Sequence, residues 1–225
     1  MQIVALVISA LALATSLVTA WLTLFRGGTV KMTHPSVIFL GPDSGPPSDR
    51  KPKVYLRTLL FCTAKRGRVI ESMYVTLSRN ESRQNFSVWV NGDDRLSRGS
   101  GMFVGETGVV ANHHFLTPRD DNSFRFQDGL YKLEVYAKLI DERSTVRLFS
   151  HELLIDKNQS DALKDPQTGI YFDWGPDAGK YLSHVETKPP NVSSADVLEG
   201  LRLAHSVMKI SKQESDEHAR NVGDN

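Results

Sequence analysis

The chain begins with a long apolar stretch and continues with short segments in which apolar and polar residues alternate. Residues 3–25 contain 18 apolar residues and five hydroxyl side chains but no charge. At about 1.5 Å per residue, a helix of this length measures roughly 34 Å, enough to cross a hydrocarbon core about 30 Å thick. The pattern therefore predicts a transmembrane anchor over residues 1–26.

Aromatic and cationic residues stand at the end of this stretch. We expect Trp21, Phe25 and Arg26 at the membrane interface, because aromatic rings and cations favour the headgroup region. A cleaved signal peptide is the alternative, since residues 18–20 are small enough to fit a cleavage site and cleavage would release a secreted soluble protein. The uncleaved anchor is favoured because the apolar stretch continues past this site and no Lys or Arg precedes it.

The charges that follow the anchor predict which side of the membrane the larger part occupies. Six cations and two carboxylates lie between residues 26 and 57, and the positive-inside rule places such a segment in the cytoplasm. A contrary signal is a set of four Asn-X-Ser glycosylation patterns, which function in a secretory lumen. They begin at Asn80, Asn85, Asn158 and Asn191. We expect a single-pass membrane protein with a cytoplasmic domain, and the opposite orientation stays open.

From residue 36 to residue 174 the prevailing period is two, as in a strand with one buried face. Tyr131, Leu133 and Val135 alternate with Lys132 and Glu134, and clusters of Gly, Pro, Asn and Asp between such segments predict turns. About eight strands are expected, over residues 37–40, 54–62, 69–77, 86–90, 108–115, 131–140, 146–155 and 170–174. Strands at such short intervals indicate an all-β fold of two packed antiparallel sheets.

A tyrosine at the start of one strand narrows this expectation. The sequence Asp-Gly-Leu-Tyr at residues 128–131 places Tyr131 directly after a turn. It resembles the tyrosine corner of immunoglobulin-like sandwiches, where the hydroxyl bonds to nearby backbone. The resemblance implies an antiparallel immunoglobulin-like β-sandwich, which we place at residues 36–185. Leu133 stands where a disulfide-bonded domain of that kind has its second Cys, so we expect Cys62 to be a small buried apolar side chain.

The carboxyl-terminal part is expected to be helical and then disordered. Ser193 and Asp196 form a capping-box pattern, and apolar residues then recur every three or four positions. This helix either docks on the parent domain or offers a surface for a partner or for oligomerisation. The expected division is a juxtamembrane segment at 27–35, a linker and short amphipathic helix at 186–212, and a disordered tail at 213–225.

Composition excludes several functions. The 225 residues contain 27 Lys and Arg against 26 Asp and Glu, a net charge of +1, which argues against a nucleic-acid binder. One cysteine rules out an intramolecular disulfide and a cysteine-based zinc site. The adjacent His113 and His114 point to opposite faces of a strand and so cannot share a metal. We therefore expect no cofactor and no metal.

One segment raises the question of catalysis. Residues 99–116 are similar to the segment around the catalytic histidine of trypsin-like serine proteases, with His114 in the place of the base. The family's Gly-x-Ser-Gly signature is absent from the residues that follow, and the nearest match, at residues 175–179, has Asp177 in place of the serine. Because a base without its nucleophile cannot carry out acyl transfer, we predict no enzyme. An anchored hydrolase using His114 stays the alternative.

An aromatic run near the end of the strand region is a candidate contact surface. Tyr171, Phe172 and Trp174 could meet a partner, because aromatic residues anchor interfaces. We favour the alternative that Phe172 and Trp174 fill one end of the sandwich core, because apolar residues two apart on a strand share a face that normally points inward. We predict a single-pass membrane-anchored β-sandwich that acts as a non-catalytic binding or scaffolding module. Its expected partners are the bilayer and a protein at or in the membrane.

Overall fold

The computed structural model describes residues 2–25, 27–43, 50–92, 97–118, 121 and 123–187. An α-helix, α1 (Gln2–Ala20), continues into a π-helical turn, η1 (Trp21–Phe25). Gln2–Thr23 has a mean hydropathy of 2.4 and is long and apolar enough to cross a membrane or to serve as a signal sequence. The helix and tail expected beyond residue 187 lie outside the described residues.

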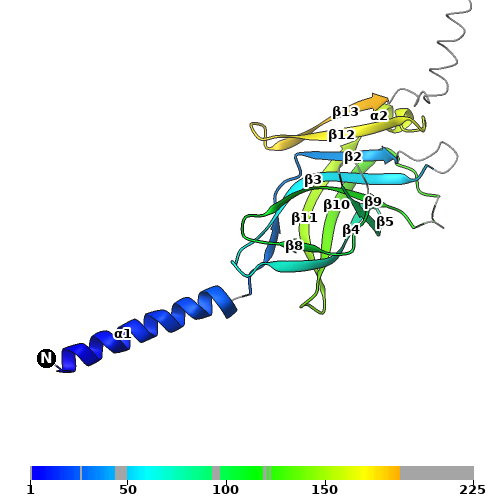
Figure 1. The fold of residues 1–225 in the computed structure, drawn as a ribbon. Coiled ribbons are helices and arrows are strands. Elements are labelled where there is room, and N and C mark those ends of the chain that lie inside the picture. Colours follow the sequence, from blue (N-terminus) through cyan, green and yellow to red (C-terminus); the bar gives the residue numbers. More distant parts are fainter. Residues whose placement is uncertain are drawn as a thin grey trace, which may run out of the picture. The chain divides into compact units, whose positions relative to one another are not determined.

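Two antiparallel sheets follow the helix (Figure 1). The larger sheet has the order β13-β12-β2-β3-β9-β6-β7, and β1 also pairs with β3. Its strands are β1 (Val30–Met32), β2 (Val37–Pro42), β3 (Pro52–Cys62), β6 (Val88–Asn91), β7 (Ser97–Arg98), β9 (Val109–Leu116), β12 (Thr168–Gly175) and β13 (Lys180–Thr187).

The smaller sheet has the order β11-β10-β4-β5, with β8 paired to β4. Its strands are β4 (Arg68–Arg79), β5 (Ser82–Phe86), β8 (Met102–Val104), β10 (Gly129–Leu139) and β11 (Thr145–Ile155). A short helix, α2 (Lys157–Ala162), begins after Asp156, whose carboxylate accepts the Gln159 N–H. Seven of the eight predicted segments each overlap one strand, whereas residues 86–90, predicted as one strand, include the end of β5 in the smaller sheet and most of β6 in the larger sheet. The sheet-rich fold is confirmed.

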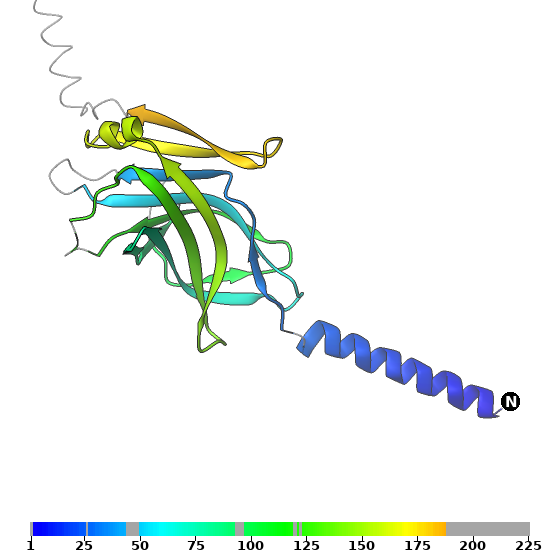
Figure 2. The same cartoon turned by 180° about the vertical axis from the view of Figure 1, so that it is seen from behind.

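The two sheets share one hydrophobic core, and Figure 2 shows β10 and β11 passing across the strands of the larger sheet. Leu56 and Leu60 enter this core from β3, while Val75 and Leu133 enter it from the smaller sheet. All four are at most 1% exposed, and burying a side chain of this size contributes about 1.5–3 kcal/mol. The alternation of apolar and polar residues in the sequence therefore reflects which face of each strand points into the core.

Tyr131 and Cys62 occupy the edges of this core. The Tyr131 hydroxyl accepts the backbone N–H of Gln127 at 2.9 Å, so it bonds back to the chain just before its strand. Cys62 is a free thiol, 1% exposed, and pairs with Val30 across β3 and β1. It is a buried apolar side chain, as expected.

Strand β13 shows why some strands were not predicted. It is an edge strand, joined to β12 by a turn that ends at Gly179, whose φ is +63°. Its apolar residues Leu182 and Val185 stand three positions apart and are 53% and 39% exposed. Since one lies on each face of the strand, the period of two is lost from the sequence.

Candidate membrane anchor and binding surfaces

Four of the five hydroxyl groups in the apolar helical segment are bonded within the segment itself. Thr15, Ser16, Thr19 and Thr23 each donate to the carbonyl four residues earlier, at 2.7–2.9 Å. A hydroxyl bonded in this way presents little unpaired polarity, which lowers the cost of placing it in hydrocarbon. The polar residues within the span are therefore compatible with a bilayer.

Two of the three residues expected at the membrane interface, Trp21 and Phe25, belong to the end of this helical segment. Trp21 begins η1 and is 62% exposed, and Phe25 is the last residue of η1. Arg26 lies outside the described residues. Sheet structure begins at Val30, so residues 26–29 form the whole connection between helix and sheet.

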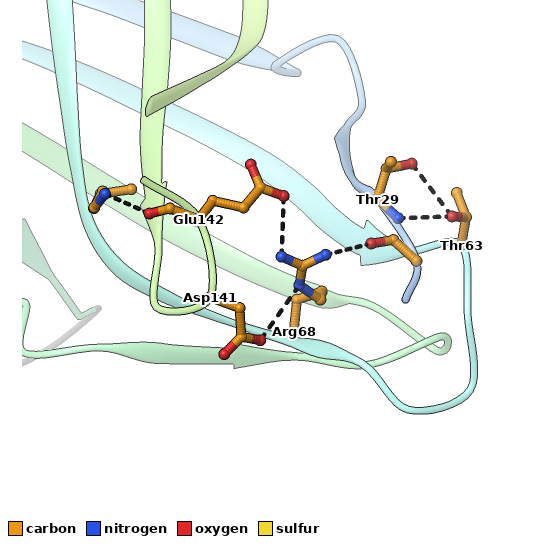
Figure 3. Close-up of polar contacts among 7 residues, drawn as sticks. Thr29, Thr63, Arg68, Asp141 and Glu142 are labelled. Carbon is orange, nitrogen blue, oxygen red and sulfur yellow. Dashed lines mark hydrogen bonds and ion pairs between the residues drawn. The ribbon is translucent and has the colours of Figure 1, made fainter. Parts of the chain in front are cut away.

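This connection is held by a cluster of polar contacts that we call the clamp: Gly28, Thr29, Thr63, Arg68 and Glu142 (Figure 3). Arg68 donates to the Gly28 carbonyl at 2.9 Å and to the Glu142 carboxylate at 3.0 Å, and its side chain is 14% exposed. Thr29 and Thr63 exchange backbone and side-chain hydrogen bonds. Charge-assisted bonds in a shielded position are stronger than neutral ones, so the clamp fixes where the chain enters the domain.

Gly28 is required by the close approach of backbone in the clamp. A Cβ on Gly28 would lie 2.6 Å from the Ala64 nitrogen and 2.7 Å from the Cys62 sulfur, closer than van der Waals contact allows. A Cβ on the neighbouring Gly27 would meet its nearest atom, on Arg68, at 3.7 Å. The two glycines therefore differ: Gly28 packs against β3 and its turn, whereas Gly27 has room for a side chain.

The structure places the three aromatic residues of the candidate contact surface in different surroundings. Phe172 is 2% exposed and belongs to the core. Tyr171 faces the other side of β12, where its ring stacks on His184 at 5.4 Å and tilts against Phe39 at 4.9 Å. Trp174, half-buried, packs with rings from other strands. Phe172 thus offers no side-chain surface, whereas Tyr171 and Trp174 are partly accessible.

Trp174 belongs to an aromatic–histidine cluster with His34, Phe149, His151 and Tyr181. His34 stacks on Trp174 at 4.3 Å between ring centroids, and His151 lies 4.9 Å from the Tyr181 ring and 6.1 Å from that of Phe149. Tyr181 donates its hydroxyl hydrogen to the Pro35 carbonyl at 2.8 Å. Residues from β11 of one sheet and from β12 and β13 of the other thus meet in one cluster.

Two titratable groups of this cluster have shifted pKa values. Burial, reinforced by the neighbouring His34, lowers the pKa of His151 against the opposing influence of Glu152. Burial raises the pKa of the Tyr181 hydroxyl. Both shifts favour the neutral form near pH 7, as expected for rings that close the side of a hydrophobic core.

The adjacent histidines of β9 have different surroundings. His113 is fully buried, and its Nδ1 accepts the Trp89 indole N–H at 3.2 Å. Burial, with a smaller effect from His114, lowers the pKa of His113 to about 4. The His114 ring lies on the opposite face, 4.8 Å from that of Tyr55. Asp177, in the place of a protease nucleophile, lies between β12 and β13. Within the described parts of the chain, no group of three or more potential metal ligands occurs.

A pocket of about 650 Å³ opens at the end of the sheets where β2 ends and β3 begins, which is the end of β3 away from the clamp. Four cationic residues line it, and among the described lining residues there is no carboxylate. Phe124, Phe126 and Leu163 supply apolar wall. The cationic residues are Arg50, Lys51, Arg125 and Lys164.

The cations of this pocket come from separate parts of the chain. Arg50 donates to the Pro166 carbonyl at 2.6 Å, which joins the start of β3 to the segment before β12. Lys164 pairs with Asp161 at 2.6 Å, but both side chains are more than half exposed, so the pair contributes little energy. Sequence analysis missed this pocket because only Arg50 and Lys51 are neighbours in sequence, while Arg125 and Lys164 come from distant segments. Its chemistry suits an anionic group with an apolar neighbour.

A comparison of the chain with protein-family models, with curated proteins and with solved structures finds no match in any of the three.

Proposed function

We propose that the protein is a single-pass membrane-anchored module whose immunoglobulin-like β-sandwich binds a protein partner without catalysis. The observation that carries this proposal is the connection between the two parts. A charge-free helix with internally bonded hydroxyls ends at Phe25, and Arg68 holds the Gly28 carbonyl three residues later. Confining a domain so closely to a membrane raises its effective concentration toward membrane partners, so modest affinity suffices.

Support for an immunoglobulin-like sandwich comes from the sheets and from Tyr131. Two antiparallel sheets share one core, and the chain passes from the smaller to the larger between Phe86 and Val88. The Tyr131 hydroxyl bonds to backbone four residues earlier, the arrangement of a tyrosine corner. The buried Leu133 takes the place of a disulfide-forming cysteine, so packing alone holds this position.

Within this proposal, the cationic pocket is the surface that receives the partner. Four cations beside two phenylalanine rings suit an acidic protein segment with an apolar side chain next to its carboxylates. The pocket lies at the end of the sandwich away from the clamp, so the anchor does not obstruct it. We place the domain in the cytoplasm, where the cations after the helix favour it.

The first experiment tests the anchor. The full chain is expressed, membranes are washed at alkaline pH, and the mature amino terminus is determined by mass spectrometry. We expect the protein in the membrane pellet with its amino terminus at Met1 or Gln2. A Leu11→Arg/Leu13→Arg variant should move to the supernatant, because two charges at mid-span oppose insertion. A mature protein that begins at Trp21 would replace the anchor with a signal peptide.

The second experiment tests the orientation. A Glu81→Cys variant places a thiol in the exposed turn between β4 and β5, while the buried Cys62 makes the unsubstituted chain a background control. An impermeant thiol reagent should label this variant after permeabilisation and not in intact cells. Labelling of intact cells would place the domain outside and make the glycosylation patterns at the exposed Asn80 and Asn158 relevant.

The third experiment tests partner binding at the pocket. A photo-crosslinking amino acid is introduced at Gln127, beside the pocket, and at Ser72, an exposed residue of β4, and membranes are irradiated. We expect a discrete adduct from position 127 that is absent from position 72. Arg125→Glu with Lys164→Glu should abolish this adduct, and Arg125→Lys with Lys164→Arg should keep it. An adduct that survives the charge reversal would reject the pocket as the binding site.

A further inference from the structure

Exposed apolar side chains cluster on the smaller sheet at the end where the clamp lies. Phe103 pairs with Val69 across β8 and β4, and the Ile140 N–H donates to the Val69 carbonyl at 3.2 Å. Phe103 and Ile140 are both 61% exposed, and Val69 is partly exposed. Because the neighbouring Leu139 and Ile70, which pair across β10 and β4, point inward, Ile140 and Val69 lie on the outer face together with Phe103. We call them the membrane-proximal patch.

The patch is held beside two cations by a tight turn. Gly67 has a φ of +67°, and a Cβ there would lie 2.5 Å from the Phe103 ring. The ring therefore packs directly on the turn that carries the exposed Lys65 and Arg66. An aromatic side chain and an aliphatic one next to cations suit the region between lipid headgroups and acyl chains.

Chain length keeps this end close to any membrane that α1 crosses. Phe25 ends the helical segment, and the clamp holds the carbonyl of Gly28. Three residues span at most about 11 Å at up to about 3.6 Å each, which is less than about twice the thickness of one headgroup layer. Arg68, which makes this attachment, is also the first residue of β4, the strand that carries Val69.

We infer that the membrane-proximal patch rests in the interfacial layer of the same bilayer that α1 spans, with Phe103 and Ile140 inserted and Lys65 and Arg66 among the headgroups. This inference rests on the proposed membrane span. Attraction of the two cations to lipid headgroups is not sufficient by itself, because the exposed carboxylates of Glu106 and Asp141 at the same end offset their positive charge. Insertion of the apolar side chains is therefore the main contribution, and it limits the domain to a narrow range of tilts.

The test uses the full chain in vesicles of phosphatidylcholine with a minor share of phosphatidylserine. A polarity-sensitive fluorophore is attached to Phe103→Cys, to Ile140→Cys or to the control Leu154→Cys. Leu154 is 62% exposed on the smaller sheet, at the end away from the clamp. Lipids with a spin label high on the acyl chain should quench positions 103 and 140 about threefold more than position 154. Equal quenching at the three positions would overturn the inference.

A second set of variants removes the patch while the probe stays outside it. With the fluorophore on Lys65→Cys, the substitutions Phe103→Ser and Ile140→Ser should reduce quenching to the level of position 154. The matched pair Leu130→Ser and Leu154→Ser, whose side chains are 53% and 62% exposed and adjacent across β10 and β11, should leave it unchanged. Alkaline extraction of the same samples separates the two proposals. A protein that stays in the membrane without quenching rejects the patch alone, whereas a protein that is extracted rejects the span.

Discussion

The arginines at the two ends of the paired sheets have different surroundings. At the clamped end, the Arg68 side chain is 14% exposed and donates to one carbonyl and one carboxylate. At the other end, Arg125 is exposed and donates to the carbonyl of its own neighbour, Phe124, beside a pocket lined by three further cations. Arg68 is enclosed and bonded to its own chain, which stabilises structure, whereas the other four cations line an open pocket that a ligand can enter.

The largest effect is expected at the clamp. Arg68→Ala leaves the Gly28 carbonyl and the Glu142 carboxylate without their donor and should lower the free energy of unfolding by about 3 kcal/mol. Chemical denaturation of the full chain in detergent measures this, and Arg68→Lys, which keeps the charge, should lose less. A loss for Arg68→Ala as small as that for Arg125→Ala would remove the difference between the two ends.

The buried His113, midway along β9, tests the contrast between enclosed and accessible charged groups with a side chain that acts through its burial and not through an ion pair. The pKa of His113 is lowered from 6.5 to about 4, so the folded protein resists protonation that the unfolded chain accepts. The stabilisation is complete above pH 6.5 and declines as the pH falls toward 4, with a loss of about 2 kcal/mol at pH 5.

His113→Gln should remove this part of the pH dependence, measured as the free energy of unfolding at pH 8 and pH 5. His184→Gln, on the exposed face of β13, is the control and should keep the dependence of the original chain. If His113→Gln retains the full acid destabilisation, the interior histidine is not its source.

A smaller effect on stability is expected to differ between Gly27 and Gly28, the two glycines before β1. Gly28→Ala should cost about 1.5 kcal/mol, because its Cβ would lie 2.6 Å from backbone and the clamp must shift to admit it. Gly27→Ala should change stability by less than about 0.5 kcal/mol, since its Cβ has ordinary contacts. Thermal unfolding of both variants measures the difference, and equal midpoints would show that the close approach at Gly28 is not maintained.

The smallest effect on stability is expected at the pocket. Arg125→Glu with Lys164→Glu should leave the free energy of unfolding within about 0.5 kcal/mol, because both side chains are exposed and the Lys164–Asp161 pair is solvated. The same variant should lose partner crosslinking. A large loss of stability would instead make these cations structural, like Arg68.

Local pattern predicted the strands well where one face of each strand is buried. In β10, Tyr131, Leu133 and Val135 point inward, so the burial of one strand face produces a period of two in the sequence. β13 was not predicted because it is an edge strand and its apolar residues lie on both of its faces. The short β7 and β8 contain two and three residues, too few for any period to show.

The candidate site was predicted less fully, and for a different reason. The placement of Phe172 in the core is confirmed, since its side chain is 2% exposed, whereas the partners of Trp174, His34 and His151, come from distant segments and were not predicted. The pocket cations are likewise spread along the chain. A pattern among nearby residues cannot predict contacts between residues that are distant in the sequence.

The sequence by itself determined the charge-free helix, the placement of most strands and the position of Tyr131, because hydropathy and period depend on residues near one another in the chain. The tertiary structure alone decided the clamp, the aromatic–histidine cluster, the cationic pocket and the membrane-proximal patch. Arg68 meets Gly28 across 40 residues and Tyr181 meets Pro35 across 146, since packing two sheets on one core brings together residues that no local pattern connects.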